Sequence, residues 1–153
     1  IYQDTLSMGI SDINSMTFEA IWEYNKGKDI QSDHLKLAFE QKNRCIEQVN
    51  KIFDKFDFLA SPSAQLFPFD KNLQFPTKIN DINLDTYHRW LEVFILSSLL
   101  DLPTITIPVG FNENGLPMGM QIIAKNKNDL KLFSFAKIYE EIYNNSKQKP
   151  KLN

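Results

Sequence analysis

Serine, lysine and histidine side chains are the groups in this chain that could carry out acyl transfer. Ser134 and Lys137 have the Ser-x-x-Lys spacing of some acyl-transfer enzymes, in which the lysine accepts the proton of a serine nucleophile. A lysine base needs a desolvated pocket that lowers its pKa. Both residues fall on the polar side of a predicted amphipathic helix, so the sequence favours a solvated helix face over a catalytic pair.

The chain has two histidines, His34 and His88, as candidate bases for a serine triad. Each falls on a predicted helix, and neither adjoins a Gly-x-Ser-x-Gly nucleophile elbow. His88 and Glu92 are four residues apart and could face one metal ion from one helix. A zinc site needs at least three protein ligands, and no second cluster supplies the others. We therefore expect no metal site, no cofactor and no catalytic residue in this chain.

Composition restricts the class of protein further. Hydrophobic residues make up 42% and charged residues 24%, which is typical of a globular domain with a sizeable core. The net charge of −2 gives no reason to expect nucleic-acid binding. Cys45 is the single cysteine, which excludes an internal disulfide framework, and its place on an apolar helical stripe predicts a core residue. No apolar run approaches the ~20 residues that span a bilayer, so we expect a cytoplasmic protein.

Two strands joined by a turn are predicted at the centre of the chain. Residues 104–107 alternate β-branched polar and apolar side chains, as in a strand, and Pro108 limits further ladder bonding. Asn114 and Gly115 form a strong turn signal. Residues 118–124 are mostly apolar and suit a strand covered on both faces. These strands predict a sheet that the rest of the chain must cover.

Helical periodicity predicts four helices around this sheet, with a further buried strand at residues 56–60. Gly27 is expected to end the first helix, and Pro103 to end the third by Asp101. Residues 1–14 are expected to be irregular, residues 62–83 a functional or mobile loop, and residues 144–153 a frayed tail. This order predicts an α/β fold, with too few strands for its helices and therefore part of a wider sheet. The predicted helices begin near Ser15, at an N-cap Ser32, near Asp85, and after an N-cap Asn128.

Four segments resemble the amidase signature family, in the order and spacing of its C-terminal third. The order and spacing agree with the family from about residue 30 to residue 143. The segments are Phe56–Ser63 (FDFLASPS), Tyr87–Val93 (YHRWLEV), Leu102–Phe111 (LPTITIPVGF) and Gly115–Ile123 (GLPMGMQII).

The resemblance implies a three-layer α/β/α fold around a large mixed sheet, and an enzyme that hydrolyses carbon–nitrogen amide bonds. Family enzymes use a serine nucleophile, a second serine and a lysine, in motifs that no stretch of this chain matches. Residues 1–153 are thus expected to be a single C-terminal segment, inactive alone, which agrees with the absence of an initiator methionine. The expected partners are the remainder of the amidase chain and a small amide substrate. A homo-oligomer is a further candidate, whereas nucleic acid and membrane are not.

The segment's expected contribution is part of the substrate pocket. Ser61, Ser63 and Trp90 lie in regions that resemble substrate-facing parts of the family. The chain departs from the family pattern at residues 98–101, where Asn-x-Ala-Gly is common, and at Ala124, where glycine is usual. The substrate preference is therefore open. The alternative is a non-catalytic, truncated amidase-like interaction module or subunit that docks through unpaired strands.

Overall fold

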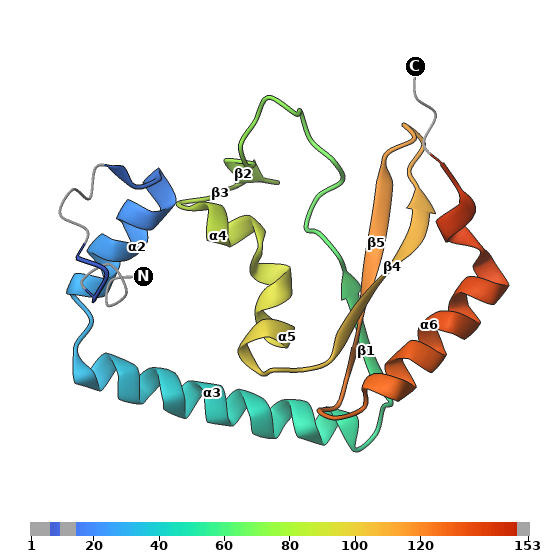
Figure 1. Cartoon of the computed structure of the whole chain (residues 1–153), viewed down its shortest axis with the longest axis horizontal. Helices are drawn as coiled ribbons and strands as arrows, with labels where there is room; N and C mark the ends of the chain where they lie inside the picture. Colours follow the sequence, from blue (N-terminus) through green and yellow to red (C-terminus); the bar gives the residue numbers. More distant parts are fainter. Residues whose placement is uncertain (1–6, 10–14, 150–153) are drawn as a thin grey trace. The chain divides into compact units, whose positions relative to one another are not determined.

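The computed structural model describes residues 7–9 and 15–149 (Figure 1). The chain divides into two compact units, residues 1–44 and 45–153. Most of the stretch 1–14, which the sequence predicts to be irregular, lies outside the described residues, as does all of 150–153. No helix in the described part of the chain is long and apolar enough to cross a membrane. The main elements are α2 (Phe18–Lys28), α3 (Ser32–Phe53), β1 (Phe58–Pro62), β4 (Thr104–Phe111), β5 (Pro117–Ala124) and α6 (Asp129–Tyr143).

The first unit contains α2 and the beginning of α3. Thr17 caps α2 by accepting a hydrogen bond from the Ala20 N–H. The prediction that Gly27 ends this helix is wrong, because the helix continues to Lys28. Ser32 is the first residue of α3 rather than its N-cap. The Nδ1 atom of His34 accepts a hydrogen bond from the Gln31 N–H at 3.2 Å, so this histidine satisfies a donor at the helix start.

The second unit is built on a three-stranded antiparallel sheet with the order β1-β5-β4. β5 is the central strand, and Ile122 pairs with Ala60 on one side and Ile105 on the other. β4 extends past Pro108 to Phe111, further than the predicted end at residue 107, because a bulge between Pro108 and Gly110 resets the register. The predicted turn forms, with Gly115 at φ +75°.

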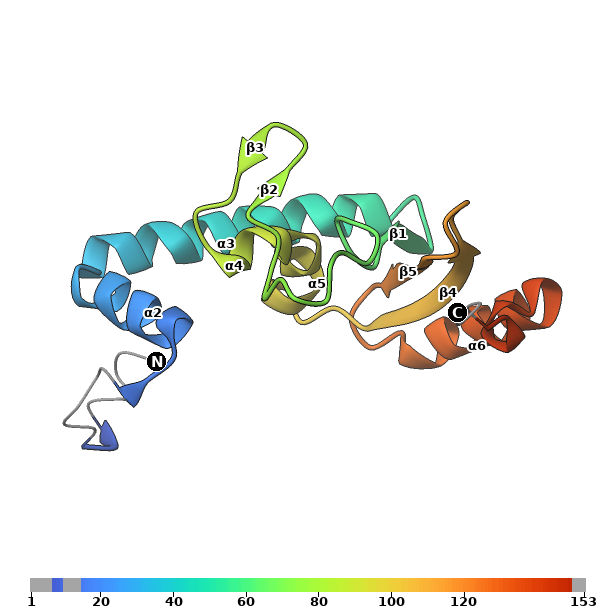
Figure 2. The ribbon, with the colours of Figure 1, turned by 90° about the horizontal axis from the view of Figure 1, so that it is seen from above.

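Helices cover both faces of this sheet (Figures 1 and 2). On one face, Ile123 packs with Val49 and Phe53 from the C-terminal turns of α3, and Cys45 lies half-buried against this cluster. On the other face, Ile122 and Ala124 pack with Leu132 of α6. The α/β class is confirmed, and the predicted two-sided burial holds for residues 121–124, whereas residues 118–120 are half-buried.

The short strand β1 differs from its prediction. It runs from Phe58 to Pro62 rather than from 56 to 60, and Phe56 is 60% exposed. Ala60 is exposed as well. β1 is an edge strand within the described residues, so one of its edges is unpaired, and its side chains are at most half-buried.

The predicted helix at 85–101 is interrupted. It forms α4 (Tyr87–Trp90), the 3₁₀ turn η2 (Glu92–Phe94) and α5 (Ile95–Leu99). The buried side chain of Gln121 donates to the Val93 carbonyl within this interruption, at 3.3 Å. The helical character of the segment agrees with the prediction, but a hydrogen bond from the sheet favours a local break.

The long connection and the C-terminal tail each contain a short regular element. Residues 62–83 contain a small hairpin, β2 (Lys78–Ile79) and β3 (Ile82–Asn83), and Pro76 is buried. The turn η3 (Asn145–Lys147) follows α6, and the Asn145 side chain donates to the Pro108 carbonyl at 3.2 Å. This bond links the turn to β4, and the frayed tail stays a prediction for the residues that follow it.

Candidate functional site

The chain leaves β1 in a loop that is fixed to the central strand. The Ser63 N–H donates to the Gly119 carbonyl at 2.9 Å. A Cβ atom at Gly119 would lie 2.6 Å from Ser63 Oγ, closer than real Cβ contacts allow. A side chain at this position would require the Ser63 hydroxyl to rotate away, and Thr106 Cγ2 and Ser63 Cβ, at 3.1 and 3.2 Å, to shift.

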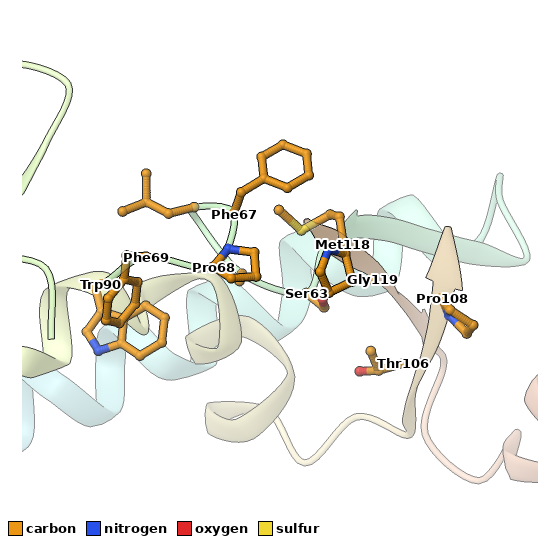
Figure 3. Close-up of a pocket in the computed structure, with 12 residues that line it drawn as sticks. Ser63, Phe67, Pro68, Phe69, Trp90, Thr106, Pro108, Met118 and Gly119 are labelled. Carbon is orange, nitrogen blue, oxygen red and sulfur yellow. The ribbon is translucent and has the colours of Figure 1, made fainter. Parts of the chain in front are cut away.

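A cavity of about 480 Å³ lies between this loop, α4 and the two long strands (Figure 3). Residues 63, 64 and 66–69 of the loop form one side, and Trp90 contributes from α4. Residues 117–119 of β5 and two residues of β4, Thr106 and Pro108, complete the lining. The loop after β1, α4 and the β4–β5 hairpin therefore form a single concave surface.

The lining of this cavity is apolar and aromatic. Phe69 packs edge-on against Trp90, with ring centroids 5.6 Å apart and planes at 90°. The hydroxyl groups of Ser63 and Thr106 are polar points in the lining, and no ionisable side chain of the described residues lines it. Such a surface can bind an apolar or aromatic group and exclude water from it, but it supplies no general acid or base.

A second hollow, of about 530 Å³, lies between the β2–β3 hairpin and α4 and has a different character. Arg89 Nε donates to Asp85 at 2.9 Å, and Nη1 donates to Glu92 at 2.7 Å. The hydrogen bond from Arg89 lowers the pKa of Asp85, and the bonds to Glu92 and Asp85 raise the pKa of Arg89. One guanidinium therefore bridges two carboxylates, and this trio keeps an excess of negative charge.

The candidate pairing of His88 with Glu92 on one helix does not occur. α4 ends at Trp90, so Glu92 lies in the following turn, where it binds Arg89. In the part of the chain that the structure describes, no group of three metal-ligating side chains comes together.

The structure brings two of the three candidate pocket residues together. Ser63 and Trp90 line the same cavity. Ser61 lies in a separate shallow hollow with Val109 and Met120, and its Oγ accepts from the Gln121 amide at 3.3 Å. A role of these residues in substrate binding stays a prediction.

The Ser-x-x-Lys spacing is a feature of a helix surface. Ser134 Oγ donates to the Leu130 carbonyl of its own helix at 2.8 Å, and Lys137 lies 3.9 Å from Glu141. Both Ser134 and Lys137 are exposed. The interpretation of a solvated helix face agrees with these contacts.

Reasoning from the sequence missed Gln121. Its side chain is 1% exposed, and its Nε2 atom donates to the Pro62 carbonyl at 2.9 Å as well as to Val93 and Ser61. A lone amide in the apolar run 118–124 is the signal that could have singled it out.

Comparison with known proteins identifies the class. A family model described as Amidase matches residues 5–133, most of the chain. A glutamyl-tRNA(Gln) amidotransferase subunit of Thermodesulfovibrio yellowstonii is 35% identical over 121 residues, which cover 78% of this chain and 23% of the relative. The same subunit from Streptococcus agalactiae is 27% identical over 154 aligned positions, which cover 99% of this chain and 30% of the relative.

A solved structure shares the fold. A bacterial aryl acylamidase of the amidase signature family superimposes with a TM-score of 0.76 at 21% identity, over 97% of this chain and 33% of that structure. The chain belongs to the amidase family. It spans 30% of the length of the Streptococcus relative and 19% of a Borreliella burgdorferi relative, so it corresponds to part of a longer amidase-type chain.

Proposed function

We propose that this chain is the C-terminal part of an amidase and that its apolar cavity receives part of an amide substrate. The supporting observation is the cavity itself: Ser63 and Trp90, from two segments that resemble the family, line one concave surface. A lining without ionisable groups suits a role in binding rather than in bond breaking.

In this proposal, the remainder of the amidase chain supplies the serine nucleophile and its lysine. The serine oxygen attacks the amide carbonyl, the amine leaves with a proton, and water then releases the acyl group from the serine. The residues of this segment bind the apolar group of the substrate, orient its amide and keep water away from the cavity. The segment also supplies three strands and their helical cover to a larger sheet.

The remainder of the chain is the proposed neighbour of the apolar surfaces left open. Leu130 and Phe133 on α6 are 82% and 63% exposed, and Val109 on the edge strand β4 is 38% exposed. Exposed apolar side chains and sheet edges favour burial against another polypeptide segment.

The test uses the longest open reading frame that contains this sequence, with small aliphatic and aryl amides as substrates. We expect amide hydrolysis by the long chain and none by the 153-residue chain alone. Ser134→Ala in the long chain should leave the rate unchanged, because this hydroxyl bonds to its own helix. A longer frame without a serine–serine–lysine core, or without hydrolysis, contradicts the proposal.

A second candidate function follows from the relatives named as amidotransferase subunits. In an amidotransferase, the ammonia that leaves the hydrolysed amide would pass to an acceptor instead of being released. A long chain that hydrolyses simple amides unaided supports the amidase, whereas one that needs an acceptor and a partner protein supports the amidotransferase.

A non-catalytic interaction module is the remaining candidate, and the exposed sheet edges are the observation that favours it. A monodisperse, cooperatively melting 153-residue monomer would support such an autonomous module. Aggregation, or obligate association with the preceding part of an amidase, supports the proposed function.

A further inference from the structure

The buried amide of Gln121 joins the two segments that carry Ser63 and Trp90. It projects from the central strand β5 and is 1% exposed. Its Nε2 atom lies 2.9 Å from the Pro62 carbonyl, one residue before Ser63, and 3.3 Å from the Val93 carbonyl, three residues after Trp90. One side chain therefore bonds to both segments while remaining outside the cavity lining.

The chemistry of the acceptors fixes the orientation of this amide. Backbone carbonyls only accept hydrogen bonds, so the nitrogen of Gln121, and not its oxygen, must face Pro62 and Val93. The Ser61 hydroxyl, at 3.3 Å, is a third acceptor on the β1 side. Replacing the amide by an apolar group would leave two carbonyls without this donor at a buried site, which is costly.

We propose that Gln121 is a positioning residue that sets the separation of the Ser63 and Trp90 walls, and thereby the width of the apolar cavity. The effect of Gln121 on substrate binding rests on the proposed function, whereas its effect on the width of the cavity does not. The alternative is an ordinary buried amide whose loss lowers stability without changing the cavity.

The experiment compares Gln121→Met with Ile122→Val in the long chain, in a background in which phenylalanine replaces Trp22 and every tryptophan outside these 153 residues, so that Trp90 is the sole tryptophan. Ile122 is the next residue of the same strand, 2% exposed and packed on the opposite face, so it is a matched control for buried substitution. Acetanilide is the binding probe, read out by Trp90 fluorescence, and acrylamide quenching measures the accessibility of Trp90.

We expect Gln121→Met to weaken acetanilide binding about tenfold, the equivalent of one lost hydrogen bond of this kind, and to increase the quenching of Trp90. Ile122→Val should change the acetanilide affinity and the Trp90 quenching by less than about twofold each, because it removes one methyl group on the face of the sheet that packs against α6. Equal effects of the two variants would overturn the proposal, since they would reflect general destabilisation.

Two measurements decide the matter if Gln121→Met does not fold. In Gln121→Glu, the carboxylate repels both carbonyls, but the protonated acid can donate one hydrogen bond, so quenching of Trp90 should decrease as the pH is lowered. In the unaltered chain, the side-chain amide protons of Gln121 should exchange slowly with solvent. Rapid exchange overturns the proposal without any variant.

The outcomes separate this inference from the proposed function. Amide hydrolysis by the long chain, together with unchanged quenching in Gln121→Met, refutes the positioning role alone. Increased quenching in a long chain that hydrolyses no amide refutes the proposed function alone. If acetanilide does not bind the unaltered chain, that result counts against the proposed substrate cavity, and Trp90 quenching decides the positioning role.

Discussion

Helix α4 contributes neighbouring residues to two hollows of opposite character. Trp90 lines an apolar cavity in which it packs against Phe69, whereas Arg89 lies in a polar hollow between two carboxylates. The apolar surface still exposes aromatic groups that a ligand could cover. The charges of the polar hollow already have partners within four residues of Arg89. Ligand binding is therefore expected in the first hollow, and local helix stabilisation in the second.

The largest expected effect comes from Gly119→Val, which fills the floor of the apolar cavity. Its Cβ would lie 2.6 Å from Ser63 Oγ, 3.1 Å from Thr106 Cγ2 and 3.2 Å from Ser63 Cβ, so the Ser63 hydroxyl must rotate and both neighbours must shift. We expect a loss of about 1–3 kcal/mol in the free energy of unfolding, measured by urea denaturation, and loss of acetanilide binding. If Gly119→Val keeps both the free energy of unfolding and acetanilide binding, the position of the loop does not depend on the contact of Ser63 with β5.

The next effect is that of Trp90→Ala on ligand binding. It removes the aromatic partner of Phe69 and one wall of the cavity. We expect the KM of the long chain for aryl amides to rise about tenfold, with a smaller change for short aliphatic amides, because the lost contact is with an aromatic group. Equal changes for both substrate classes would place the aryl group elsewhere.

Arg89→Ala is the corresponding substitution in the polar hollow and should have a much smaller effect. It breaks the ion pairs with Asp85 and Glu92, both of which are exposed, and exposed pairs contribute little. The melting temperature should change less than in Trp90→Ala, and the KM should remain unchanged. A rise in KM equal to that of Trp90→Ala would contradict the division of roles between the two hollows.

The smallest effect is a pH dependence confined to the polar hollow. Arg89 lowers the pKa of Asp85 below its ordinary value, so this carboxylate contributes stability at higher pH that is lost as the pH falls through its folded pKa. Carbon-detected NMR titration of the Asp85 carboxyl should show this lowered pKa, which Arg89→Gln should restore toward its ordinary value. An ordinary pKa in the unaltered chain would mean that the ion pair does not persist in solution.

Local elements of the second unit could be predicted from the order of residues alone. The alternation at 104–107, the Asn114–Gly115 turn and the period of residues 132–139 each follow from side-chain preferences that act over a few residues. The ordered motifs also indicated the amidase family, because each needs only residues that are adjacent in the chain.

Contacts between distant residues depend instead on how the elements pack. Gln121 contacts Pro62 and Val93, which are 59 and 28 residues away, because β1 pairs with β5 and the turn η2 packs against the same strand. The same packing interrupts the helix predicted at 85–101 and places Gly119 beneath Ser63. Periodicity cannot reveal such contacts, since it describes which face of an element is apolar and not which partner that face will have. The cavity between Ser63 and Trp90 is thus a property of the folded sheet.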